Sequence, residues 1–127
     1  MFETESHTGS PIYHTDVLMY VGTSAIGICY EVIKPEYRDL VKERVERFHD
    51  VIEIRKDQLL NFCGNCLEIP DKDGNLLLAM STAAFNAYTE LQKEKIEKHF
   101  KKIVHTDIST IEKYGGGSAR CMLAELF

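Results

Sequence analysis

The chain has 127 residues, 44% of them hydrophobic, which is enough to bury a core but leaves room for only one compact domain. The formal net charge is −5, from 15 basic and 20 acidic side chains without a basic cluster, so we expect no nucleic-acid partner. No apolar run approaches the roughly 20 residues of a membrane helix, and the first residues lack the basic and apolar regions of a signal peptide. We therefore expect no membrane partner and a cytoplasmic location.

The first half of the chain predicts a strand, strand, helix, strand unit. Apolar runs at 16–22 and 25–33 predict two adjacent strands, and 51–54 predicts a third. Between them, 35–48 has helical spacing and opens at Pro35, a residue favoured in the first turn of a helix. The apolar side chains expected on one face of this helix are Tyr37, Leu40, Val41, Val45 and Phe48.

The second half repeats that order of elements. A short helical turn leads into two strands joined by the turn "PDKDGN", then an amphipathic helix, then a strand. The predicted ranges are 56–62, 66–69, 76–81, 89–101 and 103–108. Two imperfect copies of one unit indicate a repeat architecture.

The chain has four cysteines, and without a secretion signal we interpret them as thiols. Cys63 and Cys66 form a C-x-x-C in "FCGNC", which is compatible with thiol redox chemistry or half a zinc site. No second ligand pair follows at zinc spacing, and a redox pair normally opens a helix, whereas here a helix ends and a strand begins. We expect two structural cysteines at a Gly-Asn turn, with a redox or metal module as the alternative.

A second candidate is "YHTDV", in which His14 and Asp16 precede a predicted strand. Alternation along a strand would place both side chains on one side, the imidazole as a general base and the carboxylate as a cation ligand. The alternative is a histidine at a strand edge and an aspartate in a turn. The tripeptide recurs at His105, and spacing alone does not choose between the two histidines.

The third candidate is Cys121, which follows three glycines in "GGGSARC". Glycine-rich loops allow backbone to approach a ligand closely, and a cysteine there has access to chemistry. The alternative is a small residue packed under the loop.

Four motifs, taken together, resemble a known family: "PIYHTDVLMYVGT", "LLNFCGNCLEI", "LAMSTAAFNAYT" and "STIEKYGGGSARCMLAELF". They are similar to the C-terminal part of amidinotransferase-like hydrolases of the pentein superfamily, in particular the citrulline-utilisation type. Relatives include arginine deiminase, dimethylarginine dimethylaminohydrolase and glycine amidinotransferase. The resemblance implies an α/β fold of strand, strand, helix, strand (ββαβ) repeats arranged as a propeller, here partial, with about two to three units in one domain at 1–127.

The resemblance also implies roles for individual residues. Cys121 matches the nucleophile, which attacks the guanidinium or ureido carbon and forms a covalent intermediate. His14 matches the family histidine that moves protons. Asp16 matches the acidic residue that binds the guanidinium group.

Residues around the nucleophile receive supporting roles from the same comparison. Gly116 and Gly117 would let the backbone pass close to a planar substrate, and Arg120 would orient a substrate carboxylate or pair with a nearby acid. His105 has no essential counterpart, so we expect it to be structural or on the surface. Asn65 is expected to shape the turn near the site.

The implied function is a cysteine-dependent hydrolase or deiminase of small guanidino or ureido substrates, with no cofactor and no metal. The N-terminal half of the family's domain is missing, so we expect the chain alone to be weak or inactive. The alternative is an inactive fragment that acts as a binding or assembly module. A cut propeller exposes apolar faces and strand edges, so we also expect a homo-oligomer, with a two-fold dimer the commonest arrangement.

Overall fold

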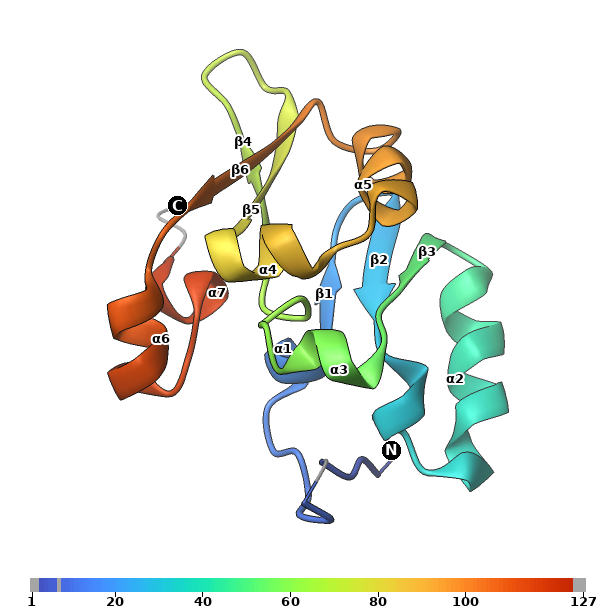
Figure 1. Ribbon diagram of the computed structural model, residues 1–127. Coiled ribbons are helices and arrows are strands. Elements are labelled where there is room, and N and C mark those ends of the chain that lie inside the picture. Colours follow the sequence, from blue (N-terminus) through green and yellow to red (C-terminus); the bar gives the residue numbers. More distant parts are fainter. Residues whose placement is uncertain (1–2, 7, 125–127) are drawn as a thin grey trace.

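The computed structural model describes residues 3–6 and 8–124, and its framework is a pair of three-stranded sheets (Figure 1). In each sheet the strands follow sequence order, the first pair antiparallel and the second pair parallel. The first sheet consists of β1 (Met19–Val21), β2 (Ala25–Ile28) and β3 (Asp50–Glu53). The second consists of β4 (Leu67–Pro70), β5 (Leu76–Ser81) and β6 (Lys102–Thr106).

Helices make the crossovers that parallel strands require. The segment between β2 and β3 contains η1, a short 3-10 helix (Tyr30–Val32), and α2 (Pro35–Glu46). Helices α4 (Thr82–Ala87) and α5 (Glu90–Glu97) lie between β5 and β6. The chain therefore contains the ββαβ unit twice, as the repeated pattern predicts.

The remaining helices are short and flank these units. Helix α1 (Thr15–Leu18) precedes β1, and α3 (Lys56–Leu59) links the units. Helices α6 (Ser109–Gly115) and α7 (Ala119–Met122) follow β6, on the opposite side of the molecule from α2 (Figure 1). None of the helices in the described part of the chain is long and apolar enough to cross a membrane.

Local chemistry explains several element boundaries. Pro35 opens α2 at a position where its missing N–H costs no hydrogen bond. Helix α5 begins with a capping box, in which Thr89 accepts from the Gln92 backbone N–H and the Gln92 side chain accepts from the Thr89 N–H. Gly74, with φ of 81°, supplies the left-handed residue of the turn between β4 and β5.

One continuous core joins the two units. It combines residues of both sheets with α1, η1, α4 and α5, among them Leu18, Ile28, Leu78, Ile96 and Phe100. Close packing within the first sheet requires Gly27, because a Cβ there would lie 2.0 Å from the Tyr20 ring.

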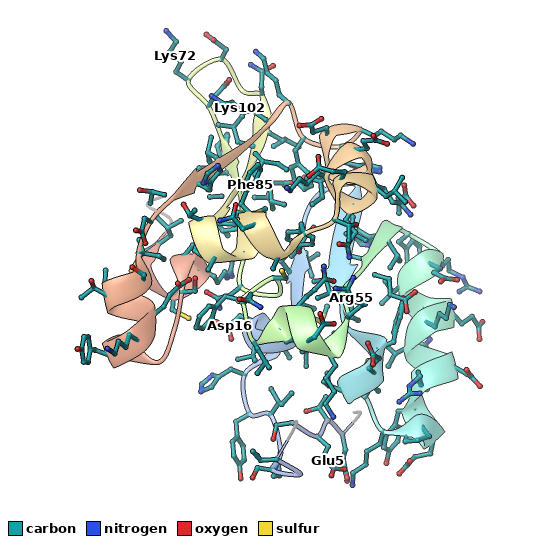
Figure 2. The ribbon with its side chains drawn as sticks, viewed as in Figure 1. Glu5, Asp16, Arg55, Lys72, Phe85 and Lys102 are labelled. Carbon is teal, nitrogen blue, oxygen red and sulfur yellow. The ribbon has the colours of Figure 1, made fainter. Side chains whose placement is uncertain are left out.

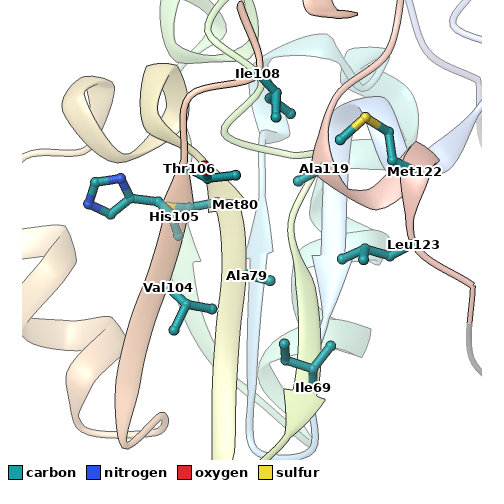
Figure 3. A pocket seen from close by; sticks show the side chains of 10 residues that line it. All are labelled: Ile69, Ala79, Met80, Val104, His105, Thr106, Ile108, Ala119, Met122 and Leu123. Atoms are coloured by element: carbon teal, nitrogen blue, oxygen red, sulfur yellow. The ribbon is translucent and has the colours of Figure 1, made fainter.

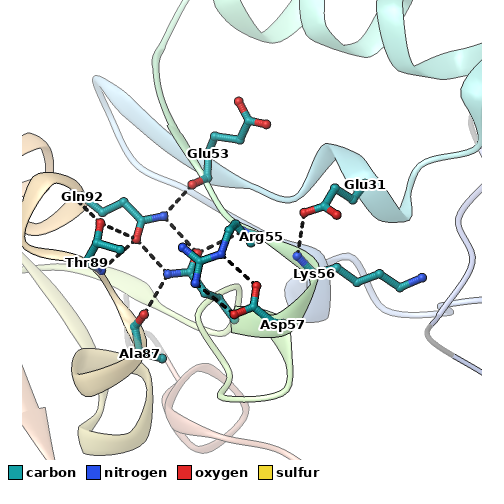
Figure 4. Close-up of polar contacts among 9 residues, drawn as sticks. Glu31, Glu53, Arg55, Lys56, Asp57, Ala87, Thr89 and Gln92 are labelled. Atoms are coloured by element: carbon teal, nitrogen blue, oxygen red, sulfur yellow. Dashed lines mark hydrogen bonds and ion pairs between the residues drawn. The ribbon is translucent and has the colours of Figure 1, made fainter.

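Polar contacts also lock the second unit to the first. Gln58 on α3 and Gln92 on α5 exchange hydrogen bonds between their amides at 2.8 and 3.0 Å, and Gln92 donates to the Glu53 carbonyl (Figure 4). On the surface, His99 Nε2 contacts Asp50 Oδ2 at 2.9 Å, and Lys95 pairs with the same carboxylate. These contacts fix α5 against the end of the first sheet.

Three expectations about the elements are corrected. The predicted strand at 16–22 begins as α1, and only three of its residues are strand. The one at 25–33 is interrupted by η1. The face predicted for α2 is only partly buried: Leu40 is 53% and Phe48 73% exposed, while Tyr37, Val41 and Val45 pack against the core.

Candidate active site

Three segments that are distant in sequence meet at the sulfur of Cys121. Its Sγ, on α7, lies 3.6 Å from Asp16 Oδ2 on α1. It also lies 3.3 Å from Nδ2 of Asn65, in the turn before β4. Cys121 is solvent-exposed, and Figure 2 shows Asp16 beside the C-terminal segment. An exposed thiol therefore meets a partly buried carboxylate and a buried amide at one point.

The glycine run sets the position of α7. Gly116 follows the last residue of α6 as its C-cap, with φ of 70° and ψ of 10°, a left-handed conformation that favours glycine. Gly117 follows, and a Cβ there would lie 3.0 Å from both Cβ and Sγ of Cys121. The next residue, Ser118, is fully buried and donates to Glu112 of α6 at 2.6 Å. The chain thus reverses sharply and is tied back to α6 just before the cysteine.

The "FCGNC" turn presses directly against the backbone of α1. A Cβ on Gly64 would lie 2.3 Å from the Val17 carbonyl oxygen and 2.9 Å from the carbonyl carbon of Leu18. Phe62, just before the turn, has φ of 63°, the one non-glycine residue with positive φ among those described. This contact brings the turn close enough for the next side chain, Asn65, to reach α1 and α7.

Asn65 is 3% exposed and connects all three segments. Its Nδ2 donates to the Asp16 carbonyl at 3.0 Å as well as contacting Cys121 Sγ, and its Oδ1 accepts from the Arg120 N–H at 3.1 Å. Sequence reasoning placed Asn65 near the site as a residue that shapes the turn. The signal for this placement was the motif around Asn65, which resembles that of the family.

His14 lies near this point but does not face the site as a strand residue would. It precedes α1 as its N-cap, with extended backbone angles, and Asp16 lies within the helix. The expected strand alternation is therefore wrong, because residues two apart on a helical turn do not share a face. Covalent geometry keeps the Cα of His14 within about 8 Å of the Asp16 Cα. Its ring is exposed and makes no hydrogen bond to any described residue.

Arg120 contributes its backbone rather than its side chain to the observed contacts. The residue is exposed, and in the described part of the chain its guanidinium forms no ion pair. Gly116 is similarly open, with no atom within 4 Å of the place where a Cβ would be.

The C-x-x-C cysteines differ from Cys121 in every respect that governs reactivity. Cys63 and Cys66 are 0% and 1% exposed, and neither forms a disulfide. Burial raises the pKa of the Cys63 thiol to about 12 and raises the pKa of Cys66 as well. Tyr88 donates to the Cys63 carbonyl at 2.6 Å within the same buried region. These features favour two structural cysteines over a redox or metal module.

His105 occupies a different part of the surface. Its ring stacks on Phe85 at 4.0 Å between centroids and contacts the Thr82 hydroxyl at 3.0 Å. Lys93 lies over the other ring of this pair, 4.3 Å from the Phe85 centroid. The structure therefore fits the expectation that His105 is a surface residue outside the site.

An apolar cavity of about 290 Å³ lies between α7 and the second sheet (Figure 3). It is bounded by strands of the second sheet, through Ile69, Ala79 and Val104, and by Met122 and Leu123 at the end of α7. Helix α7 thus separates this cavity from the polar contacts of Cys121. One face of the second sheet is only partly covered by the described residues.

The sequence as a whole was compared with known families. A sequence model of the family "N,N dimethylarginine dimethylhydrolase, eukaryotic" matches residues 1–127. The chain belongs to this family. The match confirms the resemblance to amidinotransferase-like pentein hydrolases. The citrulline-utilisation type stays a prediction.

Solved structures add support for the family fold. ArgZ, an arginine dihydrolase from the ornithine–ammonia cycle in cyanobacteria, matches in its apo form with 18% identity and a TM-score of 0.67 over 93% of this chain. Its N-terminal domain bound to product matches with 20% identity and a TM-score of 0.65 over 86% of this chain. A variant of that domain covalently bonded to a reaction intermediate matches equally well, with a TM-score of 0.65. No curated protein matches.

The match covers most of this chain but a much smaller share of the ArgZ chains. The chain spans 16% of full-length ArgZ and 36% of its N-terminal domain. Within this family-like fold, the structure brings together Cys121, Asp16 and the backbone of Arg120. It leaves the His14 ring without a contact to them. Sequence reasoning assigned no part in the site to Ser118 or Glu112, whose hydrogen bond has no local sequence pattern.

Proposed function

We propose that the chain carries the nucleophile and part of the substrate site of a guanidino-group hydrolase, with Cys121 as the nucleophile. The observation that carries this proposal is the placement of an exposed thiol 3.6 Å from the Asp16 carboxylate in a member of this family. The substrate class is a small molecule with a guanidinium or ureido group, such as arginine, methylated arginine or citrulline.

Electrostatics explain how Cys121 and Asp16 work together. A thiolate on Cys121 and the carboxylate of Asp16 would carry like charges about 3.6 Å apart and would repel each other. A bound guanidinium removes this obstacle, since it pairs with Asp16 and stabilises the thiolate at the same time. The nucleophile is then formed chiefly when the substrate is present.

The reaction proceeds in two displacement steps. The thiolate of Cys121 bonds to the guanidinium carbon, and the C–N bond to the leaving amine breaks as that nitrogen takes up a proton. Water then adds to the carbon of the covalent intermediate, gives up its protons, and the C–S bond breaks to release the ureido product and the thiolate. His14 is the proposed carrier of these protons, which requires its exposed ring to turn toward the substrate.

The surrounding residues bind the rest of the substrate. Gly116 leaves open space where a side chain would be, and Gly117 lets the backbone lie against Cys121; both are proposed to let a planar group approach the sulfur. The exposed Arg120 guanidinium is the proposed partner of a substrate carboxylate, which it can bind through two hydrogen bonds. The proposed chemistry uses protein side chains and water and requires no cofactor.

The proposed site is completed outside this chain. We place residues 1–127 as a single domain that forms the C-terminal portion of a pentein propeller, because the chain spans 36% of the matched ArgZ domain. The apolar cavity behind α7 and the exposed side chains of α2 are surfaces that further units, or a second copy in a two-fold homo-oligomer, would cover. A cytoplasmic location stays a prediction.

The test is turnover of arginine, dimethylarginine, agmatine and citrulline, measured as release of ammonia, amine or ornithine. We expect weak activity from the chain alone and a gain when the N-terminal half of a related domain is added in trans. Cys121→Ala should abolish the activity, while Cys29→Ala, at a buried cysteine, should retain it. Strong turnover by the chain alone would show that its site is complete. Failure of the added half to restore activity would favour the assembly-module alternative.

A further inference from the structure

We infer that Asn65 is the positioning residue of the Cys121 sulfur, holding it in place and supplying the N–H that its thiolate accepts. This inference rests on the proposed function, because it concerns the same nucleophile. It assigns Asn65 a role that differs from shaping its own turn. The Asn65 side chain directs its donors and its acceptor at α1 and α7.

The turn itself is built by backbone hydrogen bonds. The Cys63 N–H donates to the Gln58 carbonyl at 3.3 Å, and the Asn65 N–H donates to the Phe62 carbonyl at 2.9 Å. The Asn65 side chain instead bonds only to residues of α1 and α7, 49 to 56 positions away in sequence. A side chain that merely stabilised the turn would bond within it. The contacts of Asn65 are those of a bridge between the two helices that form the site.

The neighbours of Asn65 fix the orientation of its side-chain amide. The Arg120 N–H can only donate, so the atom that faces it at 3.1 Å must be the amide oxygen. The Asp16 carbonyl can only accept, so the atom that faces it at 3.0 Å must be the amide nitrogen. Rotating the amide by half a turn would break both bonds. The nitrogen therefore points its second N–H at Cys121 Sγ, 3.3 Å away.

This geometry serves both protonation states of the sulfur. As a thiol, Cys121 can donate its S–H to Asp16 Oδ2 or to Asn65 Oδ1, each at 3.6 Å. As a thiolate it has no proton to donate, and the N–H of Asn65 becomes its hydrogen-bond donor. The amide is buried, so water does not readily replace that donor. Asn65 thus offsets part of the repulsion that Asp16 exerts on the thiolate.

The test measures the rate at which iodoacetamide alkylates Cys121 as a function of pH, a readout independent of turnover. Trypsin cleaves after Arg120, so mass spectrometry follows the peptide that begins at Cys121. The variants are Asn65→Leu, which removes both N–H donors, and Asn65→Asp, which keeps the acceptor for Arg120. The matched control is Gln58→Leu, because Gln58 is also a buried amide, 1% exposed, that contacts α5 rather than Cys121.

At pH 7 we expect alkylation of Cys121 to fall roughly tenfold in both Asn65 variants, the size of effect that follows from losing a hydrogen bond to a charged group. The pH of half-maximal rate should rise in both and stay unchanged in Gln58→Leu. Folded Asn65 variants with the wild-type pH profile would overturn the inference, as would an equal shift in the control. Loss of the proposed hydrolase activity in the completed enzyme would not by itself affect this result.

A measurement on the unaltered chain covers the case in which the variants do not fold. In ¹⁵N-labelled protein, the side-chain amide of Asn65 should titrate with the same midpoint as Cys121 alkylation. One of its two protons should shift more than the other, because only one faces the sulfur. The Gln58 amide should not follow that titration. An Asn65 amide that is insensitive to Cys121 ionisation would contradict the inference.

Discussion

The two regions of the chain that contain candidate reactive cysteines differ in what surrounds the sulfur. In the turn before β4, apolar burial surrounds Cys63 and Cys66 and raises the pKa of both thiols. On α7, Cys121 is exposed and touches a carboxylate and an amide. The motif with the more familiar spacing is thus the buried one. Accessibility and polar partners, rather than C-x-x-C spacing, favour Cys121 as the proposed nucleophile.

The regions also depend on each other. The buried turn supplies Asn65, and Gly64 allows it to approach α1, so the buried cysteines belong to the support of Cys121. Changing each region separately tests whether the turn before β4 supports the site and α7 supplies the nucleophile.

The largest expected effect is selective alkylation. A pKa of about 12 leaves Cys63 with about a thousandfold less thiolate near neutral pH than an ordinary cysteine has, and burial blocks the reagent further. Iodoacetamide at pH 7.5 should therefore modify Cys121 at least about a hundredfold faster than Cys63, Cys66 or Cys29. Peptide mass spectrometry over time gives the four rates. Similar rates at all four cysteines would remove the distinction between the regions.

Next in size is the cost of a methyl group at Gly64. Gly64→Ala places a Cβ 2.3 Å from the Val17 carbonyl oxygen, which backbone cannot easily relieve, so stability should fall by about 2–3 kcal/mol. Chemical denaturation measures this change. Gly115→Ala is the control, since its Cβ meets only Ile111 at an ordinary 3.5 Å and the residue ends α6. Equal stability of the two variants would show that the turn does not press on α1.

A smaller effect is expected at Gly117. A methyl group 3.0 Å from Cys121 Sγ should displace the sulfur from Asn65 and Asp16, while the exposed loop absorbs most of the strain. Gly117→Ala should lower the Cys121 alkylation rate several-fold and change stability by less than about 1 kcal/mol. Alkylation kinetics and thermal unfolding on the same samples separate the two effects. A large loss of stability with an unchanged alkylation rate would show that Gly117 supports the fold rather than the position of the Cys121 sulfur.

The smallest effect concerns Asp50, which lies in neither region. Hydrogen bonds from His99 and Lys95 lower the pKa of its carboxyl group below the usual value of 3.8. The folded-state pKa is depressed, so this contribution is present above pH 4 and is lost as pH falls through the lower, folded pKa. Because the pair is partly exposed, Asp50→Asn should cost less than about 1 kcal/mol at pH 7.

Urea denaturation at pH 7 and at pH 3 measures that contribution. The difference between Asp50→Asn and the unaltered chain should shrink at the lower pH, and Cys121 alkylation should be unchanged throughout. A change in the alkylation rate would mean that Cys121 responds to the contacts of Asp50 with His99 and Lys95, which join the two ββαβ units.

The sequence predicted the two ββαβ units because their strands form clear apolar runs; all of β2, for example, is buried. It did not predict α1, since 16–22 is also apolar and a helix of four residues is too short to show helical periodicity. Helices α4, α6 and α7 are too short for periodicity to reveal. Their ends depend on single residues such as Ser81, which accepts from the Ala84 N–H to begin α4.

For the site, the family resemblance led to Cys121 and Asp16, and the structure places the two in contact. The bridge through Asn65 was not predictable, because it joins segments about 50 positions apart and depends on an amide orientation that no local pattern encodes. The strand alternation expected for His14 and Asp16 is wrong, because Asp16 lies in a helical turn that His14 precedes, while the role of His14 stays a prediction.

The amide pair of Gln58 and Gln92 has a consequence for how the family's sequences vary. Each amide is both donor and acceptor for the other, across 34 positions of sequence. Replacing one glutamine deprives the other of a donor and an acceptor, and replacing both with apolar residues would also leave the Ala87 and Glu53 carbonyls without their donors. Positions 58 and 92 should therefore covary, and where one carries an amide in a relative, the other should carry a side chain that can both donate and accept.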